Sequence, residues 1–259
     1  MNTPTLTVII ATKNEAHNIE ECIASVKFAD TILVLDSGST DSTANIARNL
    51  GATVHITDWP GYGAQQLRGI RLAQSDWVLS LDADERISEP LQDEILNAIR
   101  TPSTKSTSGY RLPRQSSFCG QFMKAGGWTP DYTLRLAKTD KAGFTDHFLH
   151  AHMTVDGTRE DLKHPITHYS YRNLDDVLEK LSRYSRGAAI DAMDRGATSG
   201  LTKAILKGFW AFLRTYIFKA GFMDGRMGLI LALFNGQTTY YKYLRIFINQ
   251  RGTSVLPNS

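Results

Sequence analysis

Four short apolar runs in the first hundred residues, separated by helical segments, limit what this chain can fold into. The runs cover residues 6–11, 31–35, 53–57 and 77–81, and most of their residues are aliphatic or β-branched. Apolar runs of this length are typical of strands buried on both faces of a sheet. Strands that alternate with helices at this spacing form right-handed βαβ units. The pattern therefore predicts an α/β fold with a mostly parallel sheet flanked by helices.

The segments between and after these runs carry helical signals. Gly51 follows the second segment, where glycine is favoured just past a helix end. Pro90 falls in the first turn of the last segment, where its missing N–H has no intrahelical partner to lose. The expected helices cover residues 16–27, 41–50, 64–73 and 88–99.

Carboxylates follow two of the predicted strands at the point where each strand ends. Asp36 follows the second run, and Asp82 and Asp84 follow the fourth. In open α/β sheets, ligands bind at the edge formed by the carboxyl ends of the strands. Neighbouring acids repel each other unless a cation lies beside them, and Mg²⁺ binds carboxylate and phosphate oxygens together. The spacing indicates a metal-assisted site for a phosphorylated donor, with a plain acidic turn or helix start as the alternative.

A nucleotide fits three acids at one sheet edge. Asp36 is placed to accept a hydrogen bond from the base, Asp82 to meet the ribose hydroxyls and Asp84 to hold a metal on the diphosphate. The sequence contains neither GxGxxG nor GK[ST], which disfavours a dinucleotide fingerprint and a P-loop. The phosphate charge would then be met by a metal rather than by a glycine-rich loop.

Charge is unevenly distributed along the chain. Residues 1–159 carry 15 Lys+Arg and 18 Asp+Glu, a balance of −3, whereas residues 160–259 carry 14 and 8, a balance of +6. Residues 201–251 contain eight basic residues and a single acid, Asp224. Such a segment favours an anionic partner surface. Because no nucleic-acid-binding motif is visible and the sheet edge is acidic, we expect a membrane surface and no nucleic acid.

The C-terminal region is expected to be helical over residues 174–195, 201–220 and 226–248. In the second helix Lys203, Lys207 and Arg214 fall on one face, as in an interfacial membrane helix; a core helix with a solvated basic face is the alternative.

The expected location is cytoplasmic, peripheral on the inner face of the cytoplasmic membrane. No apolar run approaches the roughly 20 residues that cross a bilayer. The sequence MNTPTLTVII lacks the basic segment and cleavage site of a signal peptide. Two cysteines give no disulfide framework, which favours a reducing compartment.

Three segments together resemble the signatures of family 2 glycosyltransferases with the GT-A fold. They are TVIIATKNEAHNIEECIASV, ILVLDSGSTDST and WVLSLDADE, in this order over the first hundred residues. Later segments, among them GYGAQQLRGIRLA, GGWTPDYTLRLAK, HYSYRNL and AGFMDGRMGL, resemble the branch that builds the lipopolysaccharide inner core. That branch is typified by bacterial β-1,4-glucosyltransferases that act on core heptose.

The resemblance implies an inverting, metal-dependent enzyme that moves a hexose from a UDP-sugar, with UDP-glucose as the first candidate donor. The implied acceptor is the lipopolysaccharide core or another lipid-linked glycan, and the implied cofactor is Mg²⁺ or Mn²⁺. Residues 1–161 would form the GT-A domain, with 1–100 as its nucleotide-sugar half and 101–161 as its acceptor half, and residues 162–259 a basic helical region. The family's donor positions fall on Thr12, Asn14, Glu15, Asp36 and Asp82, and its metal position on Asp84.

Two positions depart from the pattern of that branch. The branch commonly reads GAQKN where this chain has GAQQL at residues 63–67, so Arg68 is a candidate for the missing basic residue. The branch usually has Val-His-Glu, with the Glu as catalytic base, where this chain has Ala151 in the Glu position. The candidate bases are then His150 and Asp131, with Asp146 as a third.

Arg135 is a candidate for binding an anionic acceptor group or a phosphate, or for a structural ion pair. Two other function classes are possible for the chain as a whole. A nucleotidyltransferase also combines metal-binding carboxylates with a parallel sheet, but it normally has a glycine-rich basic loop where this chain has ATKNEAHN. A non-catalytic sugar- or nucleotide-binding relative would be compatible with Ala151.

Overall fold

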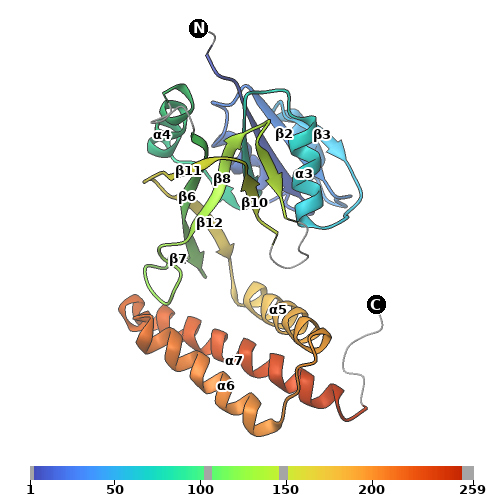
Figure 1. The fold of residues 1–259 in the computed structure, drawn as a ribbon, viewed down its shortest axis with the longest axis vertical. Coiled ribbons are helices and arrows are strands. Elements are labelled where there is room, and N and C mark those ends of the chain that lie inside the picture. The colour runs from blue at the N-terminus through green and yellow to red at the C-terminus, as the bar shows by residue number, and fades with distance from the viewer. Residues whose placement is uncertain (1–2, 102–106, 146–150, 253–259) are drawn as a thin grey trace. The chain divides into compact units, whose positions relative to one another are not determined.

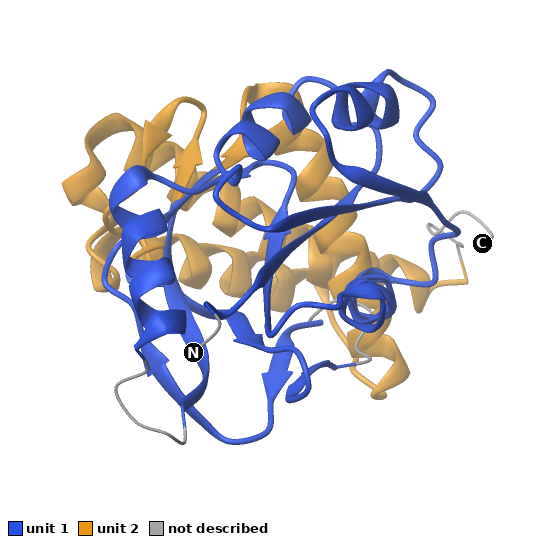
Figure 2. Cartoon of the chain, turned by 90° about the horizontal axis from the view of Figure 1, so that it is seen from above, with its two compact units in different colours: residues 1–115, 130–168 blue, residues 116–129, 169–259 orange. Residues whose placement is uncertain are grey.

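The computed structural model describes residues 3–101, 107–145 and 151–252 of the 259-residue chain. The chain forms two compact units, coloured separately in Figure 2. Unit 1 comprises residues 1–115 and 130–168, and unit 2 comprises residues 116–129 and 169–259. The chain therefore leaves unit 1 for a short segment and returns to it before the C-terminal helices. The domain division predicted at residue 161 stays a prediction.

Unit 1 is built on a mixed sheet whose first four strands are parallel (Figure 1). The parallel part has the order β3-β2-β1-β4, and the sheet then continues through β8 and β6, which pair in the antiparallel sense. This confirms the predicted α/β class and the parallel arrangement of the first hundred residues. The six strands are β1 (Leu6–Thr12), β2 (Thr31–Asp36), β3 (Thr53–Ile56), β4 (Trp77–Asp82), β6 (Thr107–Phe118) and β8 (Tyr132–Lys138).

Both faces of the parallel strands are buried, which explains their continuous apolar sequences. In β1, Val8 and Ile10 lie in one apolar cluster, whereas Ile9 between them lies in another. Successive side chains of a strand point to opposite faces, so each face needs its own cover. The helices of unit 1 are α1 (Ile19–Ala24), α2 (Thr43–Asn49), α3 (Tyr62–Leu72) and α4 (Glu89–Arg100).

Helix α1 begins three residues later than predicted. Asn14 has a φ of 56°, in the left-handed region that non-glycine residues rarely adopt. The carbonyl oxygen of Glu15 then accepts hydrogen bonds from the N–H groups of Asn18 and Ile19, both at 2.9 Å. The chain therefore makes a turn between β1 and the helix, and this turn uses the residues that were expected to form the first helical turn.

Short strands complete unit 1 and determine which side chains meet. Strand β12 pairs with β5 in the antiparallel sense, which places His168 opposite Glu85. Strands β9 and β10 form a separate two-stranded sheet. The short strands of unit 1 are β5 (Glu85–Arg86), β9 (Ala142–Phe144), β10 (Met153–Val155), β11 (Thr158–Asp161) and β12 (Ile166–Tyr171), whose last residues belong to unit 2. Strand β7 (Gln121–Phe122) lies in the inserted segment that belongs to unit 2.

Unit 2 consists mainly of helices, which confirms the predicted helical C-terminal region. Its core cluster joins Phe118 and Met123, from the inserted segment, to Tyr171, Leu181 and Leu231. Among the described residues, no helix is both long enough and apolar enough to cross a membrane. The helices are α5 (Leu174–Asp194), α6 (Leu201–Leu213) and α7 (Gly225–Asn249), with a π-helical turn at Arg214–Phe218 and a 3₁₀ turn at Gly221–Asp224.

Close packing of α6 on α7 depends on glycine. A Cβ added to Gly208 would lie 2.8 Å from the Cβ of Tyr240 and 3.0 Å from the carbonyl oxygen of Gly236. Glycine also allows α7 to pack on the 3₁₀ turn, because a Cβ on Gly228 would lie 1.8 Å from the carbonyl oxygen of Gly221.

The helix predicted to reach residue 220 ends instead at Leu213, where the chain passes into the π-helical turn.

Candidate active site

Strand register brings three of the predicted donor residues to one edge of the sheet. Thr12 lies opposite Asp36 across the β1–β2 ladder, and Ala11 lies opposite Asp82 across the β1–β4 ladder. Residues paired in register lie on the same face, and neighbours along a strand lie on opposite faces. Thr12 and Asp36 therefore lie on one face of the sheet and Asp82 on the other. A ligand that contacts both Asp36 and Asp82 must cross the edge of the sheet.

Asp36 combines a satisfied oxygen with an unsatisfied one. Its side chain is fully buried, and its Oδ1 accepts a hydrogen bond of 2.7 Å from the N–H of Ser39. In the described part of the chain, Oδ2 of Asp36 and Oγ1 of Thr12 are buried and have no hydrogen-bond partner. A buried polar atom without a partner costs about 1–3 kcal/mol, and such atoms are uncommon in folded proteins. Both oxygens therefore suit a hydrogen-bonding ligand.

Asn14 and Glu15 join the loop after β1 to the residues that follow β2. The Oδ1 of Asn14 accepts a hydrogen bond of 2.8 Å from the N–H of Thr40, and the N–H of Asn14 donates to Ser39 Oγ at 2.8 Å. The N–H of Glu15 donates to Thr43 Oγ1 at 2.8 Å. These hydrogen bonds hold the loop after β1 against the loop after β2 at the edge of the sheet. The donor-binding role expected of both residues stays a prediction.

Asp82 is held in its ionised form by two neighbours. Tyr62 donates its hydroxyl hydrogen to Oδ1 at 2.6 Å, and Nη2 of Arg135 donates to Oδ2 at 2.9 Å. Burial disfavours the charge, but the guanidinium of Arg135 and the hydrogen bond from Tyr62 outweigh it and lower the pKa of Asp82 to about 2. The carboxylate is therefore charged at neutral pH and fixed in orientation.

Glu85 is the member of this cluster that sequence reasoning missed. Its fully buried carboxylate accepts a hydrogen bond of 2.8 Å from Arg135 Nη2 and one of 3.0 Å from the N–H of Asp82. Burial raises the pKa of Glu85, and the charge of Arg135 opposes that rise. Arg135 thus forms a structural ion pair, one of its two predicted roles, and the only available sequence signal was an acid three residues after Asp82.

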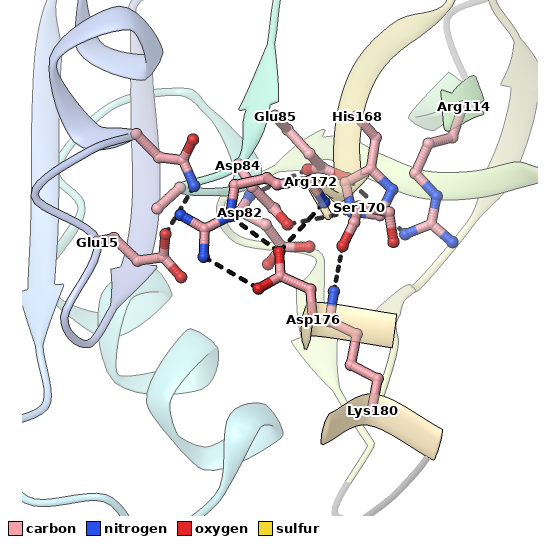
Figure 3. A network of polar contacts seen from close by, with 12 residues as sticks. Glu15, Asp82, Asp84, Glu85, Arg114, His168, Ser170, Arg172, Asp176 and Lys180 are labelled. Atoms are coloured by element: carbon pink, nitrogen blue, oxygen red, sulfur yellow. Dashed lines mark hydrogen bonds and ion pairs between the residues drawn. The ribbon is translucent and has the colours of Figure 1, made fainter. Parts of the chain in front are cut away.

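Asp84, the predicted metal ligand, lies beside a histidine (Figure 3). Nε2 of His168 is 3.4 Å from Oδ2 of Asp84, and their side chains are 13% and 24% exposed. Within the described ranges, no group of three or more His, Cys, Asp or Glu side chains could hold a metal ion. A carboxylate and an imidazole are nevertheless suitable protein ligands for a divalent ion whose remaining positions are filled by phosphate or water. The two residues therefore fit the implied metal as a partial ligand set.

The predicted catalytic bases differ in what the structure says about them. His150 and Asp146 lie outside the described residues. Asp131 is described, and its Oδ2 accepts hydrogen bonds from Nε and Nη2 of Arg114 at 3.0 and 2.7 Å. Its role as a base stays a prediction. Arg68, the candidate for a missing phosphate-facing residue, forms an ion pair of 2.7 Å with the exposed Asp58, and its expected role stays a prediction.

A pocket of about 570 Å³ opens beside Asp82. Its lining combines positive charge and aromatic rings, which suits a sugar that carries hydroxyl or anionic groups. Ala151, which stands at the position of the branch's usual Glu, forms part of the wall. The other lining residues include Tyr62, Arg111, Arg114, Tyr132, Arg135 and His152.

Comparison with known proteins assigns the chain to a family. The family model described as Glycosyl transferase family 2 matches residues 7–154, more than half of the chain. A Rickettsia bellii protein named as an uncharacterised glycosyltransferase is 29% identical over 238 residues, covering 88% of this chain and 81% of that protein. The lipopolysaccharide core biosynthesis glycosyltransferase LpsC of Rhizobium meliloti is 24% identical over 257 residues, covering 92% and 93%.

Among solved structures, glucosyl-3-phosphoglycerate synthase of Mycobacterium tuberculosis, in complex with Mn²⁺, UDP and glucosyl-3-phosphoglycerate, is 27% identical. That similarity covers 45% of each chain, with a TM-score of 0.36. The family model matches more than half of the chain, and the relatives named as glycosyltransferases align with it over most of their length. This chain is therefore a glycosyltransferase of family 2.

Proposed function

We propose that this glycosyltransferase moves a hexose from a UDP-sugar to the lipopolysaccharide core or another lipid-linked glycan, with UDP-glucose as the first candidate donor. The transfer inverts the configuration at the anomeric carbon and depends on a divalent metal. One observation carries the proposal. The ends of β1 and β2 bring two buried oxygens, on Thr12 and Asp36, to the same sheet edge as Asp82 and Asp84, and neither oxygen has a hydrogen-bond partner among the described residues. The near full-length similarity to LpsC supports the acceptor class. A peripheral position on the inner face of the cytoplasmic membrane belongs to the proposal, because such acceptors are embedded in lipid.

In this proposal the nucleoside is held from both faces of the edge. Asp36 Oδ2 accepts a hydrogen bond from the uracil N3–H, which gives the buried oxygen its missing partner. Asp82 accepts hydrogen bonds from the ribose hydroxyls. Its two oxygens already accept from Tyr62 and Arg135, but a carboxylate has about four acceptor sites, so it retains capacity for the ribose.

Asp84 and His168 would hold the metal, which when bound would offset the negative charge on the diphosphate leaving group. An imidazole nitrogen is a softer ligand than the oxygens that Mg²⁺ prefers, so this pair favours Mn²⁺ over Mg²⁺. Arg135 keeps Asp82 ionised and oriented while the neighbouring acid takes part in metal binding. The proton of the attacking acceptor hydroxyl passes to His150 or Asp131, a step that typically contributes ~10²–10⁴-fold to the rate.

The experiment is a screen for UDP release with UDP-glucose and other UDP-sugars, using truncated lipopolysaccharide core as acceptor and Mn²⁺, Mg²⁺ or a chelator. We expect transfer that the chelator abolishes and Mn²⁺ restores. Asp84→Ala should lose turnover while circular dichroism shows an intact fold. Asp93→Ala, which removes an exposed carboxylate on α4, is the matched control and should keep turnover.

Two outcomes would count against the proposal. Full turnover in Asp84→Ala would overturn the metal assignment. UDP binding without transfer from any UDP-sugar would favour a non-catalytic sugar- or nucleotide-binding protein. Ala151, at the position where the branch usually has a catalytic Glu, is the observation that supports this alternative.

A further inference from the structure

Helix α6 is apolar around most of its circumference, but only a narrow stripe of it is packed. Its buried residues are Ala204 and Gly208. The large side chains of Leu206, Phe209 and Trp210 are 62%, 59% and 52% exposed. Large contiguous apolar patches are rare on monomeric soluble proteins and mark interaction sites. This helix therefore presents a surface that needs a partner.

The exposed surface continues through the two turns after α6. Phe218, Phe222 and Met223 are 69%, 53% and 72% exposed. The rings of Trp210 and Phe218 lie 5.4 Å apart, so α6 and the π-helical turn share one aromatic surface. We call the exposed side chains of Leu206, Phe209, Trp210, Phe218, Phe222 and Met223 the apolar face. An apolar groove of about 510 Å³ between α6 and α7 adjoins it at Phe209.

Basic residues border the apolar face. At 100° per residue, Lys203 and Lys207 on α6 and Arg214, the first residue after it, fall within about 40° of one another. This basic stripe lies between Trp210 on the exposed side and Ala204 on the packed side. All three basic side chains are exposed. Around this helix an exposed apolar side is followed by the basic stripe and then by the packed side. Helices that lie in a membrane interface likewise combine an apolar face with flanking Lys and Arg residues.

The single acid of this segment does not offset the positive charge. Residues 201–251 contain eight basic residues and only Asp224 as an acid. Asp224 is 7% exposed, and its carboxylate accepts hydrogen bonds from the N–H groups of Lys124 and Ala125 at 3.0 and 2.9 Å. Its charge is therefore used inside unit 2, and residues 201–251 present only positive charge to the solvent.

We propose that the apolar face inserts into the headgroup region of an anionic bilayer, with Lys203, Lys207 and Arg214 contacting lipid phosphates. Charge complementarity favours this occupant over a second copy of the chain, which would bring the same basic residues into contact. The interfacial orientation agrees with the finding that no described helix could cross a membrane. The inference deepens the peripheral membrane position of the proposed function, but its observations lie in unit 2 alone, so it holds or fails independently of the site in unit 1.

The experiment is sedimentation of the full chain with phosphatidylcholine vesicles that either contain or lack phosphatidylglycerol. We expect binding that requires phosphatidylglycerol and weakens with added salt. The triple variant Lys203→Gln, Lys207→Gln, Arg214→Gln should bind anionic vesicles on the order of a hundredfold more weakly, since each basic residue near the surface contributes about a factor of five. The matched control is Lys27→Gln, Arg48→Gln, Arg71→Gln, which removes three exposed charges from unit 1 and should not weaken binding.

A second pair of variants tests the apolar face. Leu206→Ser with Trp210→Ser should abolish binding to anionic vesicles, whereas Trp59→Ser, at a side chain 48% exposed in unit 1, should leave it unchanged. UDP release with a soluble acceptor should be the same in these unit 2 variants as in the unmodified chain, which separates loss of membrane binding from loss of catalysis. Absence of vesicle binding by the unmodified chain would overturn the proposal. So would a dimer in solution that Trp210→Ser dissociates, because the face would then belong to a second copy.

Discussion

Nη2 of Arg135 lies 2.8 Å from Oε1 of Glu85, a carboxylate with no exposed surface. The same nitrogen also donates to Asp82 at 2.9 Å, so one guanidinium links a buried acid to the predicted ribose ligand. This cluster makes the stability of unit 1 and the geometry of the predicted donor site depend on the same cation.

Replacing Arg135 with Met should strongly destabilise unit 1. The change leaves Glu85 buried without its nearest cation, and breaking a buried ion pair in this way costs about 3–5 kcal/mol. Adding Glu85→Gln to Arg135→Met should recover much of the loss. The measurement is the free energy of unfolding in urea. Arg111→Met, which breaks an ion pair with Asp161 whose partners are 42% and 41% exposed, is the control and should change the free energy of unfolding little, because solvent screens an exposed ion pair. Equal losses in the two single variants would contradict the structural role of Arg135.

Acid should remove the stability contributed by Asp82. Its folded-state pKa is lowered from 3.8 to about 2, so the contribution is fully present above pH 3.8 and is lost as the pH falls through about 2. Glu85 acts in the opposite direction, because its raised pKa makes its ionised form unfavourable in the folded state. We expect the difference in unfolding free energy between the unmodified chain and Asp82→Asn to shrink over this acid window. A difference that stays constant from neutral pH to pH 2 would argue against a charged Asp82 in the folded chain.

Asp36→Asn should change the preferred base of the donor. The variant can still accept the hydrogen bond from Ser39 through its amide oxygen, but it presents an N–H group where Asp36 has Oδ2. An N–H group repels the uracil N3–H and pairs with N3 of cytosine. We expect UDP to bind about 10–100-fold more weakly, from a lost charge-assisted hydrogen bond of about 1.5–3 kcal/mol, while CDP loses little or gains. Calorimetric titration with both nucleotides measures this, and an unchanged preference for UDP would place the base elsewhere.

His168→Ala should weaken the preference for Mn²⁺ over Mg²⁺. If Nε2 of His168 binds the metal beside Asp84, its loss removes the nitrogen ligand and leaves oxygen ligands, which suit both ions. We expect the affinity for Mn²⁺, measured by electron paramagnetic resonance in the presence of UDP, to fall at least about tenfold, or 1.4 kcal/mol. The control is His164→Ala, at an exposed histidine paired with Glu94. Equal Mn²⁺ affinity in the two variants would exclude His168 as a ligand.

His150→Ala should lower turnover by roughly 10²–10⁴-fold while changing the affinity for the donor little, as expected for the loss of a general base. Single-turnover rates and donor titrations separate the two effects. Unchanged turnover would shift the assignment to Asp131 or Asp146. Ala151→Glu restores the usual residue of the branch on the wall of the pocket, and it should rescue part of the turnover lost in His150→Ala.

The parallel strands of unit 1 were predictable because each is encoded locally. Val8, Ile9 and Ile10 are apolar in succession because both faces of β1 are covered, and the acids that follow such strands reach the same edge for topological reasons. The turn at Asn14 was not predictable, because a left-handed asparagine leaves no periodic signal. The π-helical turn after Leu213 was likewise not predictable, because the apolar pattern of the sequence continues through it without a break.

The pairs that define the site were beyond local pattern. Asp84 meets His168 only because β5 pairs with β12, and Arg135 reaches Glu85 only because β8 adds to the sheet beside β4. Each contact joins residues at least 50 positions apart in the chain. Sequence reasoning identified Asp82, Asp84 and Arg135 as candidates but missed Glu85 and His168, because these pairings depend on strand register in the antiparallel half of the sheet.

The inserted segment has a consequence for the order in which the chain can fold. Phe118 and Met123 leave the ribosome about a hundred residues before Leu231, the side chain in α7 that shares their cluster. Until synthesis reaches α7, these apolar side chains have only part of their final cover, at a stage when the strands of unit 1 are already available to pair. Nascent chains whose apolar side chains stay exposed in this way are prone to misassembly and depend on chaperones. A fragment ending at residue 168 would remain permanently in this unfinished state, so a shortened catalytic unit also requires that residues 116–129 be replaced by a tight turn.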